Sequence, residues 1–210
     1  MTSAPTPTPR TLAPTQQSRP TPVRVPDLLT RFIRIPSPLG RIEIVADAGE
    51  HPAIVGVTLE SAGALPLDDL DDRPDELLLE AADQIGAYFL GQVPVPIGAA
   101  GPPAPPPPFT VPVRAEGTAF QRAVWAQLTR VPFGTATTFG DLAAAAGAPA
   151  AGRAVGCAVR RNPLALLVPC HRVLASGGRF AAYSGVNRSG GNGQPTKAWL
   201  LEHEGIDHHP

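Results

Sequence analysis

The chemistry of this chain is expected at Cys170 and His171, which are neighbours in sequence and follow a short apolar run. A thiol is a nucleophile only as its thiolate, so a reactive cysteine needs a nearby base or a positive field that lowers its pKa. The apolar residues 164–168 predict a buried strand that delivers Cys170 into the floor of a site. Pro169 would end this strand, because proline cannot donate to a β-ladder.

The same fragment also has a plainer interpretation. A cysteine after an apolar strand is often a small buried hydrophobic residue rather than a nucleophile. One neighbouring histidine does not decide between the two, so the choice depends on the rest of the C-terminal half.

Several further motifs surround Cys170 in the C-terminal half. In chain order the motifs are Gly152-Arg153-Ala154-Val155-Gly156, Asn162-Pro163, Pro169-Cys170-His171-Arg172-Val173, Tyr183-Ser184-Gly185 and Trp199-Leu200-Leu201-Glu202-His203-Glu204-Gly205. Together they resemble the O6-alkylguanine-DNA alkyltransferases, also called methylated-DNA–protein-cysteine methyltransferases. The resemblance is close over 118–205 and looser over 31–91. It implies DNA repair by direct, irreversible, stoichiometric transfer of an alkyl group from O6-alkylguanine to the cysteine, with O4-alkylthymine as a further candidate substrate and no cofactor.

The resemblance assigns the catalytic roles to four residues. Cys170 is the nucleophile, and His171 is the base that takes its proton through a water. Glu204 orients the histidine, and Asn162 holds the turn around the site. This is the usual arrangement of an activated nucleophile whose base is steered by a third group. Because Glu204 lies far from Cys170 in sequence, the fold must bring them together.

The resemblance also implies a pocket for a flipped base, since an alkyl group on a base edge is inaccessible in stacked duplex. Tyr183 and Ser184 would hydrogen-bond the base, with Tyr183 donating a proton to the leaving guanine. Val159 would form an apolar wall, and the backbone at Cys170 and Val173 would accept from the exocyclic amine.

Thr118 is expected to cap a helix that runs to about Arg130. Thr138 can cap the next helix, over 140–146, and the glycine-containing turn 147–149 leads into another helix that ends near residue 161. These last two helices form a helix-turn-helix pattern. The second helix is rich in small residues and can approach a narrow groove closely; by resemblance it enters the minor groove, whose hydrogen-bond code is degenerate. Arg153 would fill the space left by the flipped nucleotide, with a phosphate contact as the alternative. The expected DNA-binding residues are Arg153, Phe139, Ala154, Gly156 and Arg160. Phe139 stands where many relatives carry a tyrosine.

The near-neutral net charge of −1 hides two unlike halves. Residues 1–113 contain 7 Lys and Arg against 13 Asp and Glu, whereas residues 114–210 contain 10 against 5. A basic half indicates a polyanionic partner, although it can also be a solvated surface. No apolar run is long enough to span a bilayer, and the N-terminus lacks a secretory signal, so we expect a cytoplasmic protein without membrane contact. The two cysteines should be free thiols, with Cys157 packed on a helix.

The sequence predicts two domains of an α+β/α class. Residues 1–26 form a disordered Pro/Thr-rich tail, 27–92 a small mixed α/β scaffold that is ribonuclease H-like by resemblance, 93–113 a Pro-rich linker, and 114–210 a helical, winged helix-turn-helix domain that carries the active cysteine. In the scaffold, strands meet at a turn near 37–40, a third strand covers 53–59, and a helix covers 74–90. The expected inward face of this helix is Leu78, Leu79, Ala82, Ile85 and Phe89. This half has no cysteine, so no metal site is expected.

Three other functions stay open beside alkyl transfer. The first is an alkyltransferase-like module that recognises damaged double-stranded DNA without efficient transfer, although such proteins lack an acceptor cysteine. The second is a thiol hydrolase with a Cys-His-Glu site. The third is a sequence-specific regulator, which would need long polar side chains on the second helix for major-groove readout. Cooperative self-association on DNA is likewise left open.

Overall fold

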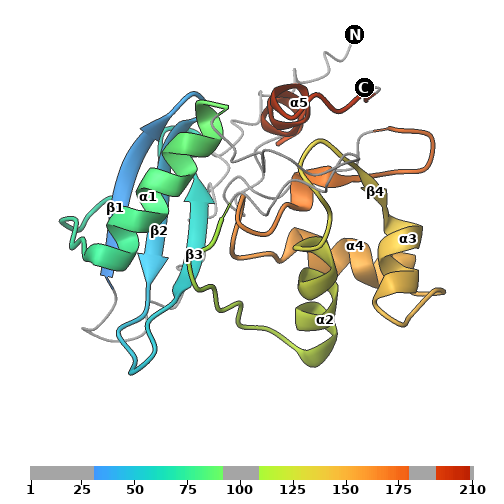
Figure 1. The fold of residues 1–210 in the computed structure, drawn as a ribbon, viewed down its shortest axis with the longest axis horizontal. Helices are drawn as coiled ribbons and strands as arrows, with labels where there is room; N and C mark the ends of the chain where they lie inside the picture. The colour runs from blue at the N-terminus through green and yellow to red at the C-terminus, as the bar shows by residue number, and fades with distance from the viewer. Residues whose placement is uncertain (1–30, 92–108, 180–192, 209–210) are drawn as a thin grey trace, which may run out of the picture.

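The computed structural model describes residues 31–91, 109–179 and 193–208. Figure 1 shows two neighbouring parts: a three-stranded sheet with helix α1 across one face, and a group of helices in the C-terminal half. The predicted tail, most of the predicted linker, Tyr183 and Ser184 lie outside the described residues. Within the described parts, no helix is long and apolar enough to cross a bilayer.

The N-terminal sheet is an antiparallel meander in the order β1-β2-β3. Its strands are β1 (Arg31–Ser37), β2 (Gly40–Ala46) and β3 (Ile54–Leu59). Ile42, Ile44 and Ala46 alternate along β2 and are buried in the core, and Gly40 lies at the tight turn between the first two strands with a φ of +96°. The three predicted strands are therefore confirmed.

Helix α1 (Glu76–Phe89) begins two residues after Pro74, because Asp75 is the N-cap and its side chain accepts a hydrogen bond from the backbone of Leu78. The predicted inward face is wrong at Leu79, whose side chain is 51% exposed. The buried residues are Leu78, Ala81, Ile85 and Tyr88. Both sets fit a 3.6-residue period, since they differ by a small rotation about the helix axis. In the structure, α1 is rotated so that Tyr88 faces the interior.

Residues 109–114, at the end of the predicted linker, lie alongside β3. The backbone nitrogen of Ile54 donates to the carbonyl of Pro112 at 2.8 Å, and Arg114 donates to the carbonyl of Ile54 at 2.9 Å. Val111 is buried. This segment is therefore extended and adds to the sheet edge, where it is hydrogen-bonded to β3 instead of running free as a linker.

The described residues of the C-terminal half, 114–179 and 193–208, form four helices, a short 3₁₀ helix and two short parallel strands. The elements are α2 (Ala119–Leu128), β4 (Thr137–Thr138), α3 (Phe139–Ala145), α4 (Gly152–Arg160), η1 (Cys170–Arg172), β5 (Val173–Leu174) and α5 (Gln194–His203). The helix starts predicted from Thr118 and Thr138 are confirmed: each hydroxyl caps its helix, and Thr118 forms a reciprocal capping box with Gln121. Buried Trp125 joins α2 to α4 by donating to the carbonyl of Ala158 at 2.9 Å.

One hydrophobic core runs through both halves, from Ile42 in the sheet to Leu200 in α5. The halves also share backbone hydrogen bonds, because Val57 of β3 donates to the carbonyl of Pro163 at 2.9 Å. The segment that leads to Cys170 is thus packed directly against the sheet.

Candidate active site

The segment 164–168 is a buried turn and not the predicted strand. Leu164 makes one isolated bridge to Val57, and the chain then turns back so that Val168 donates to the carbonyl of Leu164 at 2.8 Å. Leu166 has a φ of +69°, a left-handed conformation that a leucine rarely adopts. Continuous apolar residues indicate burial, but they do not distinguish a strand from a turn whose polar groups are satisfied elsewhere.

Asn162 supplies the hydrogen bonds that hold this turn. Its side-chain amide donates to the carbonyl of Val168 at 2.8 Å, and its oxygen accepts from the backbone of Leu164 at 3.1 Å. The same amide nitrogen lies 3.3 Å from Sγ of Cys170. Cys170 is only 3% exposed. One side chain therefore fixes the turn and also donates to the sulfur.

His171 is fully buried beside Cys170, and its Nε2 lies 2.7 Å from Oε1 of Glu204. An ionised carboxylate can only accept hydrogen bonds, so Nε2 carries the proton and Nδ1 is left with a lone pair. Nδ1 is buried and has no hydrogen-bond partner among the described residues. Burial lowers the pKa of His171, an effect that outweighs the attraction of Glu204. The neutral imidazole is therefore favoured, with Nδ1 available to accept a proton.

Glu204, at the end of α5, is the centre of a buried hydrogen-bond network. Arg172 donates to both carboxylate oxygens, from Nε at 2.7 Å and from Nη2 at 3.0 Å. The backbone nitrogen of Gly134 lies 3.4 Å from Oε2. Burial alone would raise the pKa of Glu204, but the hydrogen bonds and charges of His171 and Arg172 lower it to about 2. The carboxylate is therefore ionised at neutral pH.

Two further residues belong to this site, and neither was predicted: Tyr88 joins the network of Glu204, and Lys197 lies next to it. The hydroxyl of Tyr88, in α1, donates to Oε1 of Glu204 at 2.9 Å. Lys197 is 1% exposed and donates from Nζ to the carbonyl of Val173. Burial lowers the pKa of Lys197 to about 8, although Cys170 acts to raise it. The residues lie far apart in sequence, and no local pattern connects them, so only the fold reveals the contacts.

Comparison with known proteins shows what this chain is similar to. Residues 119–206 match the family model described as 6-O-methylguanine DNA methyltransferase, DNA binding domain. The methylated-DNA–protein-cysteine methyltransferase of Cricetulus griseus is 37% identical over 182 residues, which cover 81% of this chain and 79% of that protein. This chain belongs to the methylated-DNA–protein-cysteine methyltransferase family.

Two solved structures extend this assignment to the fold of the methyltransferase family. O6-methylguanine methyltransferase of Mycobacterium tuberculosis is 30% identical with a TM-score of 0.65, over 84% of this chain and 93% of that one. Mycobacterium tuberculosis OGT in complex with DNA is 31% identical with a TM-score of 0.57, over 84% and 92% of the two chains. The present chain has the same mixed α/β architecture.

Helix α4 is the part of this methyltransferase family member that was predicted to bind DNA. Arg153, Ala154, Cys157 and Arg160 are exposed on it, whereas Val155, Ala158 and Val159 are buried against the other helices. The prediction that Cys157 is packed is therefore wrong: its side chain faces solvent, where Arg160 donates to its sulfur at 3.3 Å. The small side chains of α4 leave its outer surface with little bulk, and they also let its inner face pack closely against the other helices.

Phe139, at the start of α3, is half-buried beside Gly156 of α4. A Cβ built on Gly156 would lie 3.7 Å from the phenylalanine ring, so the two predicted DNA-binding residues share one contact between α3 and α4. Arg153 and Ala154 line a shallow depression with Ala150, Ala151 and Cys157. The structure thus brings the predicted DNA-binding residues onto α4 and its immediate neighbour.

The predicted pocket residues are only partly described. Val159 and Val173 are buried in the same hydrophobic core cluster as Cys170, and the Val173 carbonyl already accepts from Lys197. A carbonyl oxygen has a second lone pair, so this bond does not prevent it from accepting another donor. Among the described ranges there is no group of three His, Cys, Asp or Glu side chains that could hold a metal ion.

Proposed function

We propose that this protein repairs alkylated DNA by moving the alkyl group from O6-alkylguanine to Cys170, once per molecule. The observation that carries the proposal is the ionised, buried Glu204, which fixes the tautomer of His171 directly beside the cysteine. Membership of the methyltransferase family supports the same reaction. Cys170, His171, Glu204 and Asn162 form the proposed catalytic group.

In the proposed reaction, Nδ1 of His171 takes the thiol proton through a water, and Glu204 stabilises the imidazolium that results. The thiolate attacks the alkyl carbon, a carbon–sulfur bond forms, and the bond from that carbon to O6 of guanine breaks. The guanine leaves with a proton from Tyr183, whose phenolate then takes a proton from solvent while His171 releases the thiol proton to solvent. Asn162 donates to the sulfur, which favours the thiolate over the neutral thiol. The thioether product has no good leaving group, so the protein acts once, and no cofactor takes part.

The proposed DNA-binding unit is a winged helix-turn-helix, in which α3 and α4 are the two helices. Helix α4 enters the minor groove, and Arg153 fills the space of the flipped nucleotide, while Phe139, Ala154, Gly156 and Arg160 complete the contact. A relative solved in complex with DNA supports DNA as the partner, as does the excess of 10 Lys and Arg over 5 Asp and Glu in residues 114–210. The N-terminal domain is a ribonuclease H-like scaffold.

The flipped guanine would be read by Tyr183, Ser184, the side chain of Val159 and the backbone of Val173. O4-alkylthymine is a further candidate substrate. Cooperative self-association on DNA and a cytoplasmic location stay predictions from the sequence.

The proposal is tested by the intact mass of the protein after incubation with excess duplex that contains one O6-methylguanine. Wild-type protein should gain the mass of one methylene and then stop, because the acceptor is consumed. Cys170→Ser should gain nothing. Cys157→Ser is the matched control, since these are the two cysteines of the chain, and it should gain the same mass as the wild type.

Two results would overturn the proposal. Binding to the lesion without any mass gain would favour the damage-recognition module. Repeated turnover of a thioester or amide substrate without DNA would favour the thiol hydrolase.

A further inference from the structure

We propose that Tyr88, in the N-terminal domain, is a positioning residue for alkyl transfer that acts by holding Glu204 against His171. This inference rests on the proposed function, because the hydrogen bond between Glu204 and His171 affects alkyl transfer only if Cys170 is the acceptor. It assigns the N-terminal domain a direct part in the reaction, beyond scaffolding.

The contact is buried and specific. Tyr88 is 2% exposed, and its hydroxyl donates to Oε1 of Glu204 at 2.9 Å. The same oxygen lies 2.7 Å from Nε2 of His171. Tyrosine and histidine therefore share one carboxylate oxygen. Burial raises the pKa of Tyr88, as does the nearby charge of Glu204, so the phenol keeps its proton and stays a donor at neutral pH.

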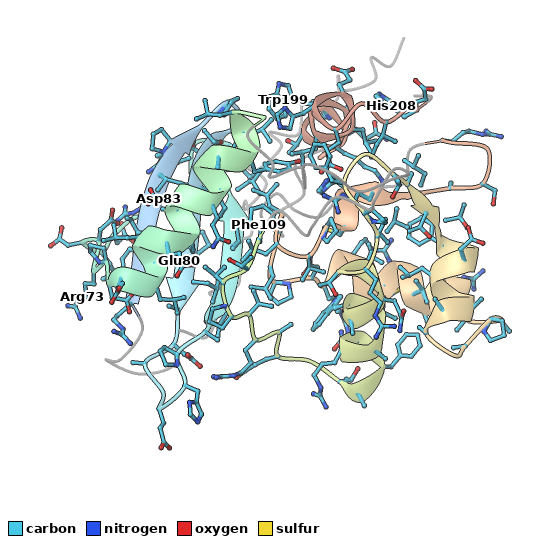
Figure 2. The ribbon with its side chains drawn as sticks, in the orientation of Figure 1. Arg73, Glu80, Asp83, Phe109, Trp199 and His208 are labelled. Atoms are coloured by element: carbon cyan, nitrogen blue, oxygen red, sulfur yellow. The ribbon has the colours of Figure 1, made fainter. Side chains whose placement is uncertain are left out.

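A second set of contacts fixes Tyr88 itself. Nε2 of His203, the residue before Glu204, lies 2.8 Å from the carbonyl of Tyr88. The ring of Tyr88 meets the His203 ring edge-on at 5.0 Å, and His203 stacks on Trp199 at 5.0 Å. Trp199 also lies 5.7 Å from Phe89. In Figure 2, Trp199 lies between α5 and the end of α1. The C-terminal ends of α1 and α5 are therefore joined by hydrogen bonds and aromatic packing on both sides of the Tyr88–Glu204 bond.

The shared oxygen gives Tyr88 an electrostatic effect as well as a positional one. A carboxylate that accepts from a phenol has less negative charge to offer the imidazole, so the hydroxyl holds the basicity of His171 down. The charged groups that act on His171 are Glu204, Arg172 and Lys197. Removing the hydroxyl of Tyr88 changes none of these charges, so its effect can be measured separately.

The test is Tyr88→Phe in the full-length protein, with single-turnover transfer from O6-methylguanine duplex measured from pH 5 to 9. Transfer at the pH plateau should fall by about tenfold, since a charge-assisted hydrogen bond that fixes the carboxylate is lost. The acidic limb of the profile should move up by about half a pH unit, because Glu204 then stabilises the protonated His171 more strongly. Histidine ¹⁵N NMR on the same variant should show the same upward shift for His171.

Phe89→Leu is the matched control, because Phe89 contacts the Tyr88 ring and Trp199 but makes no hydrogen bond with Glu204. It should lower the melting temperature and leave the pH profile in place. The inference is overturned if Tyr88→Phe moves neither rate nor profile, or if it behaves as Phe89→Leu does. Failure of the wild type to accept a methyl group would instead overturn the proposed function, while the NMR shift of His171 would still decide the role of Tyr88.

Discussion

At the scale of single residues, Glu204 is a buried charge that is stable only because its donors are in place. Arg172 spans both oxygens and also donates from Nη1 to the carbonyl of Val131 at 2.6 Å. A lysine could not replace this planar, forked contact. The arginine of the Pro-Cys-His-Arg motif therefore serves the carboxylate, as a structural group rather than as a contact to substrate.

The network makes stability depend on pH in the acid range. Glu204 has a pKa of about 2 in the folded protein, against an ordinary value of 4.5. Its ionisation therefore contributes about 3 kcal/mol to the free energy of unfolding above pH 4.5. That contribution is lost as the pH falls from 4.5 toward 2. His171, whose pKa is lowered by burial from 6.5, acts in the same direction below pH 6.5, because the unfolded chain then binds a proton that the folded protein resists. Urea unfolding between pH 7.5 and 3.5 should show the free energy of unfolding fall in both ranges.

Glu204→Gln is the control for this pH dependence. The variant should be less stable at pH 7, yet its free energy of unfolding should no longer fall specifically between pH 4.5 and 3.5. It should also slow alkyl transfer and leave DNA affinity nearly intact. An unchanged slope in that range would mean that other carboxylates dominate acid unfolding.

At the scale of elements, helix α4 packs into the core with one face and exposes its arginines on the other. Val155, Ala158 and Val159 bury the inner face, whereas Arg153 and Arg160 are exposed on the outer face. In the proposed complex, the small side chains of the outer face would let α4 approach the duplex closely, so that an exposed arginine could reach into it.

Arg153→Ala should reduce transfer from duplex by about tenfold or more, because the energy of holding the flipped nucleotide is of the order of a few kcal/mol. Reaction with O6-methylguanine as the free base should hardly change, since no flipping is needed. Rates from both substrates measure the difference. Arg130→Ala removes an equal charge from an exposed residue just after α2 and should not separate the two rates. Equal losses of both rates in Arg153→Ala would mean that Arg153 is not the flipping residue.

The elements also show what could be predicted from sequence. Local signals were sufficient for the strands and for the caps at Thr118 and Thr138, because a cap depends on a few neighbouring residues. Local signals failed at 164–168, because a run of apolar residues can form either a buried turn or a buried strand. They failed again on α1, where a small rotation of the helix face decides whether Tyr88 or Phe89 points inward. The catalytic motif residues were found by resemblance, but Tyr88 and Lys197 join the site only through tertiary contacts.

At the scale of the whole molecule, the two halves are held together at the site. β3 is hydrogen-bonded to the chain at Pro163, α1 is bonded to Glu204, and a single core crosses the boundary. Separating the halves would leave an ionised carboxylate without one of its donors and would expose the turn below Cys170.

We therefore expect the protein to unfold in one cooperative transition. Both tryptophans, Trp125 and Trp199, lie in the C-terminal half, so their fluorescence reports that half, while hydrogen exchange of the β2 amides reports the sheet. The two probes should give the same midpoint in urea. A lower midpoint for β2 would show that the halves unfold separately.

The contrast between the two thiols has a practical consequence. Cys157 is exposed on the outer face of α4, whereas Cys170 is 3% exposed beneath its turn. A short treatment with a maleimide dye should therefore label the first and spare the second. A dye at Cys157 would fill the depression next to Arg153 and should therefore block the proposed DNA contact while the acceptor sulfur stays unmodified. If the proposed function holds, the labelled protein should lose transfer from duplex and keep its reaction with free O6-methylguanine, which would separate docking from methyl capture.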